Sequence, residues 1–269
     1  MAGFVCLGTD PVVCTGRVPA YPNDVAVVVP AEFHSRPRAD VILYLHGNNA
    51  SNRTLAQYLS DFQLPQALKA SGRDAIMVVP LSVGPVTQQH EAALGPAAGY
   101  RAFLTQILDR ARQGGLVSEV EPDSITLAGH SGAYRGLSLI ASNGVWADRT
   151  RELYLIDSIY AAKDSFLNFA KDPSHRLWHV TTPHGGTQVQ ASCLQLRLKA
   201  AGLGYFGCEI YSAACGSAPA VNVSCRPPTD VGPTDWDSTR LGFLYTPVAH
   251  DAAVPQWLPR FLAPGAHIH

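Results

Sequence analysis

Short, uninterrupted apolar runs recur along the chain, and they constrain its fold more than any other feature of the sequence. These runs are rich in β-branched residues, are bounded by turn residues, and cover residues 25–29, 41–45, 75–79, 125–128, 153–156, 177–181 and 241–245. Runs this short and this uniformly apolar are typical of strands that are buried on both faces. The sequence therefore predicts a sheet that is covered on both sides.

Stretches with the apolar period of a helix lie between most of these runs. They cover residues 54–69, 97–113, 134–143, 188–200 and 253–262. Alternating strands and helices form right-handed crossover units, in which the strands run parallel and the helices pack on both faces of the sheet. We expect an α/β fold with a mostly parallel central sheet, and functional residues directly after the carboxyl ends of its strands.

Length and composition limit the classes of protein to which the chain can belong. It has 269 residues, of which 46% are hydrophobic and 15% are charged, and its formal net charge is −1. This composition excludes a disordered chain, and the length suits a single α/β domain over residues 1–269. A nearly neutral chain has no field that attracts nucleic acid, and no apolar run approaches the ~20 residues that span a bilayer. We expect no nucleic-acid partner and no integral membrane segment.

Six cysteines form two clusters, at positions 6 and 14 and at positions 193, 208, 215 and 225. None belongs to the C-x-x-C pair expected of a zinc site or a redox motif. The clustering suggests three disulfides, for instance between Cys6 and Cys14, and hence a secreted or periplasmic protein whose signal peptide has been removed. The alternative is a cytosolic protein in which all six thiols are reduced and buried.

Residues 202–236 interrupt the alternation of strands and helices. This segment is rich in Gly, Pro, Ser and Cys and precedes the last predicted strand. A connection of this length is usually functional or disordered. We expect a cysteine-rich insertion, which is either a disulfide-held flap beside the active site or a decoration far from it.

The most informative segment leads from a predicted strand through Gly129–Ala133 (GHSGA) into a predicted helix. In this context the pattern G-x-S-x-A is typical of a nucleophile elbow, a strained turn that lifts a serine hydroxyl, here that of Ser131, clear of the sheet. The five-residue pattern arises easily by chance in a chain of this composition. The strand before it and the helix after it therefore carry the interpretation.

Together with the segments around it, this elbow resembles the corresponding part of the α/β-hydrolase superfamily, over about residues 25–262. The predicted strand that ends in His46-Gly47 resembles the strand before the oxyanion loop of that superfamily. The resemblance implies an oxyanion hole made by the backbone N–H groups of Asn48 and Gly132. Two such fixed donors stabilise the negative oxygen of a tetrahedral intermediate.

The resemblance also implies an acid and a base for this serine. Asp157 follows the strand after the elbow helix, which matches a variant of the superfamily with the acid one strand earlier than usual, and Asp235 and Asp237 are the fallback acids. His250 follows the last predicted strand, where the superfamily has its catalytic histidine. His184 competes for this role because it also follows a strand.

The order of serine, acid and histidine along the chain is that of the α/β-hydrolases. The resemblance implies that Ser131 attacks a small or polymeric carboxylic ester, that His250 takes its proton, and that Asp157 orients His250. No metal or organic cofactor is expected, and no substrate-binding residue is identified. Two alternatives stay open: an amidase or peptidase with the same triad, and a non-catalytic binding module of this fold.

A second pair of histidines is a possible metal site. His175 and His179 are four residues apart, a spacing that places two side chains on one helix face. Neither a third ligand nor a glutamate accompanies them, as a zinc site would require. We expect a pair of histidines at the surface.

Overall fold

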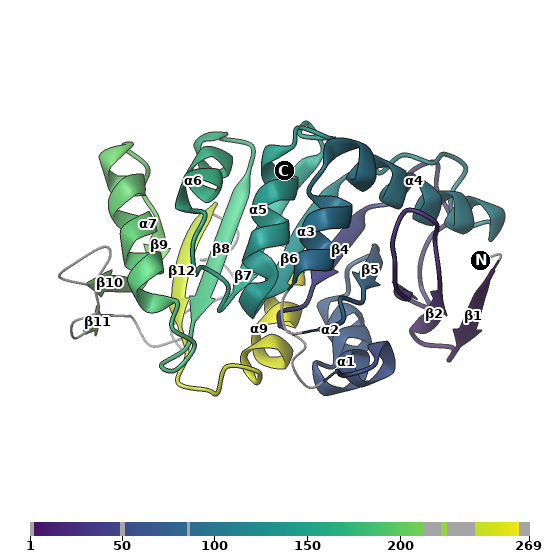
Figure 1. Cartoon of the computed structure of the whole chain (residues 1–269), viewed down its shortest axis with the longest axis horizontal. Coiled ribbons are helices and arrows are strands. Elements are labelled where there is room, and N and C mark those ends of the chain that lie inside the picture. The colour runs from purple at the N-terminus through teal and green to yellow at the C-terminus, as the bar shows by residue number, and fades with distance from the viewer. Residues whose placement is uncertain (1–2, 49–51, 85–86, 212–221, 225–239, 264–269) are drawn as a thin grey trace.

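A computed structural model describes residues 3–48, 52–84, 87–211, 222–224 and 240–263 (Figure 1). The strands of its main sheet are β1 Phe4–Leu7, β2 Val12–Gly16, β3 Val25–Val29, β4 Val41–Leu45, β5 Ile76–Pro80, β6 Ile125–His130, β7 Thr150–Ile156, β8 Arg176–Thr181, β9 Phe206–Gly207 and β12 Leu241–Tyr245. Their order in space is β1-β2-β3-β5-β4-β6-β7-β8-β12-β9. From β5 to β9 all neighbours are parallel, whereas β1, β2 and β3 form an antiparallel edge. The predicted mostly parallel α/β sheet is confirmed.

Helices cover both faces of this sheet, as the sequence predicts. They are α1 Leu55–Asp61, α2 Leu64–Ser71, α3 Gln88–Leu94, α4 Ala97–Gln113, α5 Tyr134–Ser142, α6 Lys163–Lys171, α7 Gln188–Ala200 and α9 Ala253–Leu262. Helices α3 to α7 pack on one face, the near face in Figure 1, and α1, α2 and α9 pack on the other. Side chains alternate along a strand, so Leu43 and Leu45 of β4 join the first core, and Ile42 and Tyr44 join the second. No helix in the described residues is long and apolar enough to cross a membrane.

Two strands of the sheet lie within the first two dozen residues, which fall outside the resemblance. Strands β1 and β2 pair antiparallel, and Cys6 and Cys14 lie opposite each other in this pair and form a disulfide. The sequence pattern misses both strands because they are not buried on both faces: Val5 is 67% exposed and Leu7 is 72% exposed. The sheet therefore begins before the first run that the sequence predicts.

The single helix predicted over residues 54–69 is two helices. Helix α1 ends at Asp61, Gln63 adopts a left-handed φ of 50°, and Pro65 lies in the first turn of α2. A proline fits the first turn of a helix because the N–H that it lacks would have no partner there, and in a helix interior it breaks the hydrogen-bond ladder. The apolar period continues across this break, which explains why the pattern predicts one helix.

The described residues of the cysteine-rich insertion lie beside α7. They form β9 and a separate two-stranded sheet of β10 Glu209–Tyr211 and β11 Asn222–Ser224. Cys193 and Cys208 are both disulfide-bonded, and no cysteine is free in the part of the chain that the structure describes. Cys215 and Cys225 lie outside the described residues.

Candidate active site

Five parallel strands end at one edge of the sheet, and a candidate site residue follows each of them. Asn48 comes after β4, Ser131 after β6, Asp157 after β7, Thr182 after β8 and His250 after β12. In open α/β sheets, ligands bind in the crevice outside the carboxyl ends of the strands. The topology thus brings together residues that are up to two hundred positions apart in the sequence.

Ser131 lies in a tight turn between β6 and α5. Its φ is 55°, in the left-handed region that side-chain-bearing residues rarely adopt. A Cβ atom on Gly129 would lie 2.8 Å from the Cβ of Ala133, so the two arms of the turn approach too closely for a side chain at that position. This is the strained backbone that the G-x-S-x-A pattern predicts.

The loop after β4 approaches this turn closely. A Cβ atom on Gly47 would lie 2.5 Å from the Cβ of Ser131 and 3.0 Å from the backbone nitrogen of Gly132. A Cβ atom on Gly132 would in turn lie 3.5 Å from the backbone nitrogen of Asn48. The two N–H groups that the sequence assigns to an oxyanion hole therefore lie close together, next to Ser131.

His46 fixes the direction of one of these N–H groups. Its Nε2 accepts a hydrogen bond from the backbone N–H of Ser82 at 2.8 Å, so the ring carries its hydrogen on Nδ1, which donates to the carbonyl of Gly47 at 2.7 Å. Burial lowers the pKa of His46 to about 4, and the ring is neutral near pH 7. The C=O and N–H of a trans peptide point in opposite directions, so a bound Gly47 carbonyl directs the N–H of Asn48 to the other side. The sequence did not predict this function for His46.

Asp157 is fully buried at the end of β7 and also has a left-handed backbone, with a φ of 45°. Its carboxylate accepts a hydrogen bond from Nδ1 of His250 at 2.6 Å, and two more from the hydroxyls of Thr182 and Thr187. Burial raises the pKa of Asp157, but the three hydrogen bonds outweigh burial and hold this pKa below its usual value. The acid is therefore ionised at neutral pH.

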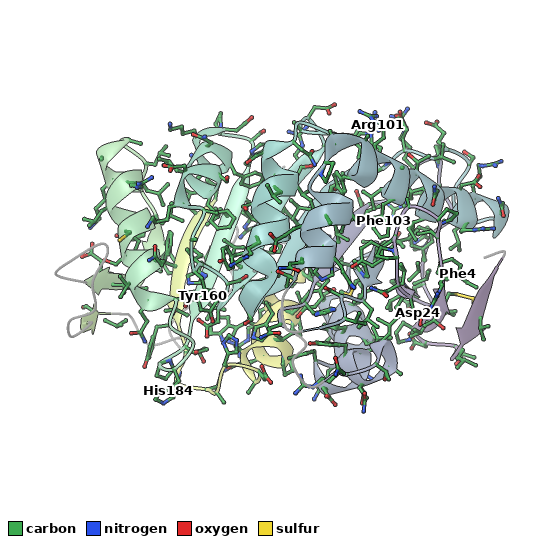
Figure 2. The ribbon with its side chains drawn as sticks, in the orientation of Figure 1. Phe4, Asp24, Arg101, Phe103, Tyr160 and His184 are labelled. Carbon is green, nitrogen blue, oxygen red and sulfur yellow. A yellow bond between two sulfur atoms is a disulfide. The ribbon has the colours of Figure 1, made fainter. Side chains whose placement is uncertain are left out.

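The loop over residues 182–187 encloses this carboxylate. The sequence shows no acid after β8, and the structure shows that the loop supplies threonine hydroxyls to Asp157 instead. A Cβ atom on Gly185 would overlap Oδ2 of Asp157, so the backbone itself covers the acid. His184 is exposed at the outside of this loop (Figure 2). Sequence reasoning missed both threonines, because isolated hydroxyls have no recognisable pattern.

The histidine that contacts the acid is His250. With Nδ1 donating to Asp157, its Nε2 is left to accept a proton. In the described residues the hydroxyl of Ser131 makes no hydrogen bond to His250, although both side chains line one cavity. Such contacts are often long without substrate.

Tyr160 also interacts with the side chain of Ser131. Burial raises the pKa of Tyr160 to about 12, and the interaction with Ser131 lowers this pKa in part.

The side chain of Ser131 lines a cavity of about 300 Å³. The residues that line it are Gly47, Asn48, Arg53, Tyr58, Phe62, His130, Ser131, His250 and Asp251. The guanidinium of Arg53 lies over the rings of Tyr58 and Phe62 and forms an ion pair with Asp251 at 3.5 Å. Ligand pockets range from roughly 300 to 1,000 Å³, so this cavity suits a small group.

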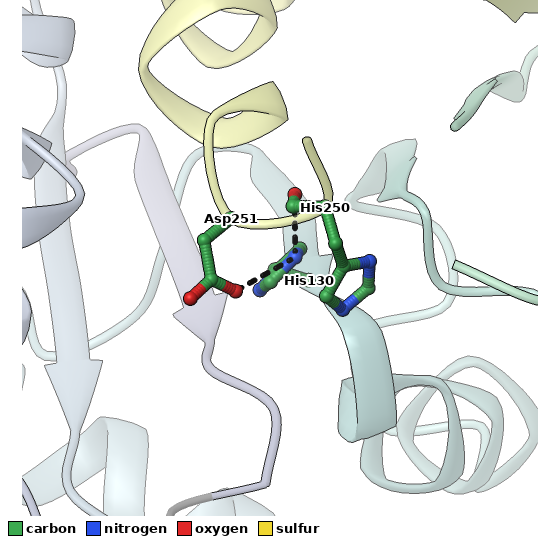
Figure 3. Close-up of side chains that lie close together, drawn as sticks. All are labelled: His130, His250 and Asp251. Atoms are coloured by element: carbon green, nitrogen blue, oxygen red, sulfur yellow. Dashed lines mark hydrogen bonds and ion pairs between the residues drawn. The ribbon is translucent and has the colours of Figure 1, made fainter. Parts of the chain in front are cut away.

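Three atoms of the kind that bind metals lie within 4.8 Å of one another, one each from His130, His250 and Asp251 (Figure 3). Nε2 of His130 lies 3.2 Å from the carbonyl oxygen of His250, which only accepts, so this nitrogen carries a hydrogen and offers no lone pair to a metal. Burial and the neighbouring His250 lower the pKa of His130 to about 3. In this arrangement the cluster holds the His250 loop in place. The fallback acids Asp235 and Asp237 lie outside the described residues.

The prediction that His175 and His179 form a surface pair is wrong. His179 lies within β8, is fully buried, and its ring Nδ1 forms a hydrogen bond with the carbonyl of Leu155 at 2.9 Å. His175 precedes that strand and stacks on the ring of Phe169. The spacing of four residues does not place the two side chains on one helix face, because His179 lies in strand β8, which begins at Arg176.

No protein-family model matches the sequence, and no curated protein matches it either. Several solved structures have the same architecture. An S-formylglutathione hydrolase from Agrobacterium tumefaciens has a TM-score of 0.55 at 11% identity, over 97% of this chain and 96% of that one. A thermostable esterase from Pseudomonas putida has a TM-score of 0.52 at 12% identity, over 98% and 83%.

A third match is carboxyl esterase 2 from the mycorrhizal fungus Tuber melanosporum. It has a TM-score of 0.50 at 12% identity, over 99% of this chain and 82% of that one. Such low identities carry information about the fold alone. This chain has the α/β-hydrolase fold. Its mostly parallel sheet carries helices on both faces, and a serine lies at a strained strand-to-helix turn.

Proposed function

We propose that the chain is a serine hydrolase that cleaves carboxylic esters, with the whole chain acting as one catalytic domain. The contact that carries this proposal is the 2.6 Å hydrogen bond between His250 and the buried, ionised Asp157, at the sheet edge where Ser131 occupies a strained turn. A serine hydroxyl is a weak nucleophile until an imidazole accepts its proton, and a carboxylate holds that imidazole in the correct tautomer.

In the proposed mechanism the hydroxyl of Ser131 attacks the ester carbonyl carbon while its proton moves to Nε2 of His250. The carbonyl oxygen becomes an oxyanion and accepts hydrogen bonds from the N–H groups of Asn48 and Gly132. The tetrahedral intermediate collapses when His250 protonates the leaving alcohol, and an acyl-enzyme remains on Ser131. Water, deprotonated by His250, then attacks the acyl carbon. The bond to the Ser131 oxygen breaks as His250 returns the proton to that oxygen, and the acid is released.

An ester is the substrate class that we propose, on the strength of proteins with a similar fold. The cavity of about 300 Å³ beside Ser131 accommodates a small acyl or alcohol group. Proteins of similar fold are esterases and an S-formylglutathione hydrolase. Amide cleavage would use the same groups, and a comparison of matched ester and amide substrates separates the two.

Covalent labelling with a fluorophosphonate tests the mechanism directly. We expect the folded protein to be labelled at Ser131, and p-nitrophenyl acetate and butyrate to be cleaved faster than the corresponding anilides. Ser131→Ala should abolish both labelling and turnover. Ser138→Ala is the control, because it removes a serine hydroxyl from the helix after the elbow, where that hydroxyl donates to the backbone carbonyl of Arg135. Absence of label in the folded protein would favour a non-catalytic binding module.

We also propose that the protein matures in an oxidising compartment, as a secreted or periplasmic enzyme. The Cys6–Cys14 disulfide and the disulfide-bonded Cys193 and Cys208 support this location, because disulfides are rare in the reducing cytosol. Thiol titration of the denatured, unreduced protein should find no free thiol. Six free thiols in protein isolated from its native source would contradict the proposal.

A further inference from the structure

The residue after the proposed acid contacts the elbow as well. Ser158 is fully buried, and its hydroxyl donates a hydrogen bond to the backbone carbonyl of Ser131 at 2.7 Å. That carbonyl belongs to the same peptide unit as the N–H of Gly132, one of the two proposed oxyanion donors. The C=O and N–H of a trans peptide point in opposite directions. A carbonyl held by Ser158 therefore turns the N–H of Gly132 toward the position where the oxyanion forms.

This peptide needs support from outside the turn. The φ of Ser131 is strained at 55°, and Gly132 has no Cβ, so nothing in the side chain of Gly132 prevents the peptide between them from rotating. The following peptide is also held, because the hydroxyl of Thr87 donates to the carbonyl of Gly132 at 3.1 Å. If the Ser158 hydroxyl were removed, the Ser131 carbonyl would lose a buried donor, which weakens the hold on this peptide.

The second proposed donor is held in the same way. The peptide that carries the N–H of Asn48 has its carbonyl bound by Nδ1 of His46 at 2.7 Å. Each oxyanion N–H thus belongs to a peptide whose carbonyl accepts a hydrogen bond from a buried side chain. Enzymes gain most from donors that are already oriented before the reaction, since such donors need no reorganisation as the charge develops.

The backbone at Asp157 explains how two neighbouring residues both reach the site. In an extended strand, successive side chains point to opposite faces of the sheet. The left-handed φ of 45° at Asp157 breaks this alternation at the end of β7. As a result the carboxylate of Asp157 binds His250, and the hydroxyl of Ser158 binds the elbow.

We propose that Ser158 is a positioning residue that orients the N–H of Gly132 for oxyanion binding. The end of β7 thereby orients two groups. Asp157 orients His250, the proposed proton acceptor, and Ser158 orients the N–H of Gly132, a proposed oxyanion donor. This inference rests on the proposed function.

Ser158→Ala tests the inference with p-nitrophenyl acetate as substrate and an alkyl trifluoromethyl ketone as inhibitor. Such a ketone adds to a nucleophilic serine and places an oxyanion in the hole, so its affinity reports on the donors. We expect kcat to fall about ten- to hundredfold, less than the 10²- to 10³-fold cost of deleting a donor outright, with KM within about twofold. Inhibitor affinity should fall by a similar factor. Ser158→Thr, which keeps the hydroxyl, should recover most of both losses.

Ser138→Ala provides the control for the loss of a serine hydroxyl bound to a backbone carbonyl, and it should leave kcat and inhibitor affinity unchanged. If Ser158→Ala does not fold, Ser158→Cys replaces it, and its weaker donor should give an intermediate loss. A kcat within twofold of wild type, or an unchanged inhibitor affinity, would overturn the inference. Failure of the wild-type protein to react with fluorophosphonate would instead overturn the proposed function, so the two failures are distinguishable.

Discussion

The two sides of this site hold their reactive groups in different ways. On the serine side the loop at Gly47 lies against Ser131, and the proposed oxyanion donors are backbone N–H groups, those of Asn48 and Gly132. On the acid side the hydrogen bonds come mainly from side chains: the carboxylate of Asp157 accepts from two threonine hydroxyls and an imidazole, besides the backbone N–H of Thr182. Backbone donors require glycine where chains approach closely, whereas side-chain donors require particular hydroxyls.

The difference has consequences for substitutions. On the serine side a methyl group added at Gly47 would clash, because the neighbouring atoms belong to the backbone and to Ser131. On the acid side a hydroxyl has an isosteric apolar replacement, and the remaining donors still hold the carboxylate. Loss of the acid itself should therefore be most severe, a clash at the oxyanion loop should come next, and loss of one supporting hydroxyl should be mild.

Asp157→Asn should have the largest effect and lower kcat by about 10⁴-fold, as in other serine triads. The amide can donate to Nδ1 of His250 and so favours the tautomer with its hydrogen on Nε2, which cannot accept the proton of Ser131. Steady-state kinetics at neutral pH measures this loss, and circular dichroism shows whether the fold is intact. Asp235→Asn and Asp237→Asn are the controls, since the sequence offers both as alternative acids. A loss below tenfold for Asp157→Asn would assign the role to another acid.

Gly47→Ala should rank second, with kcat lowered by about 10²- to 10³-fold, the cost of losing one oxyanion donor. The added Cβ would lie 2.5 Å from the Cβ of Ser131, and the loop that carries the N–H of Asn48 must move away. Gly204→Ala is the matched control, because a Cβ there meets nothing within 4 Å. If Gly47→Ala retained activity within threefold, the loop after β4 would not form the oxyanion hole.

Much of the sheet could be predicted from the sequence, because parallel strands buried on both faces are continuous apolar runs. The same reasoning failed at the antiparallel edge, where Val5 and Leu7 face outward and the runs are short. It also failed at Gln63 and Pro65, where one apolar period continues through two helices. Periodicity reports which side chains are buried, and it does not report where a chain changes direction.

The candidate site also has residues that the sequence predicts and residues that it does not. The sequence led to Asn48, Ser131, Gly132, Asp157 and His250, and the structure places all of them at one edge of the sheet. Each belongs to a motif or follows a predicted strand directly. Their roles in catalysis remain predictions.

The groups that support this site were not predictable from the sequence. Thr182, Thr187 and Ser158 are ordinary hydroxyl residues, and their contacts depend on how separate strand ends meet in space. His46 was part of a recognised motif, but its hydrogen bond to the Gly47 carbonyl depends on the position of the Ser82 backbone. Motifs identify reacting groups, whereas the groups that orient them require coordinates.

Thr187→Val should have a smaller effect than either substitution above. It removes one hydroxyl donor from Asp157 at nearly constant volume, and His250 and Thr182 still bind the carboxylate. We expect kcat to fall about tenfold and the free energy of unfolding to fall by about 2 kcal/mol, as is typical when a buried charged group loses a hydrogen bond. Urea denaturation and steady-state kinetics measure the two effects.

Thr187→Val should also change how the free energy of unfolding depends on pH in acid. A carboxylate whose folded-state pKa is depressed stabilises the fold above its unfolded pKa, and this stabilisation is lost as pH falls through the folded pKa. Removing the Thr187 hydroxyl raises that folded pKa, so the total loss should be smaller, and should level off at a higher pH, than in the wild type. Thr150→Val is the control, because this buried hydroxyl binds the carbonyl of Trp146 on another part of the sheet. Equal acid curves for the two variants would contradict the role given to Thr187.

Buried histidines give the last effect, a gradual loss of stability with acid. Burial lowers the pKa of His46 and His179 to about 4 and that of His130 to about 3, from an ordinary value of 6.5. Between pH 6.5 and about 4 the unfolded chain therefore binds protons that the folded chain does not, and the free energy of unfolding falls as pH falls. Each such histidine should contribute about 1 kcal/mol per pH unit.

This acid sensitivity distinguishes the two sides once more, since His46 and His130 lie on the serine side and His179 lies behind the acid. Removing two serine-side histidines, as His46→Asn and His130→Asn together, should reduce the pH slope of stability about twice as much as His179→Asn does. Urea denaturation at pH 7, 6 and 5 measures these slopes, with His184→Asn at an exposed position as the control. A wild-type stability that stays constant from pH 7 to 5 would show that these rings take up protons in the folded state, and the neutral tautomers assigned to His46 and His130 would then be wrong.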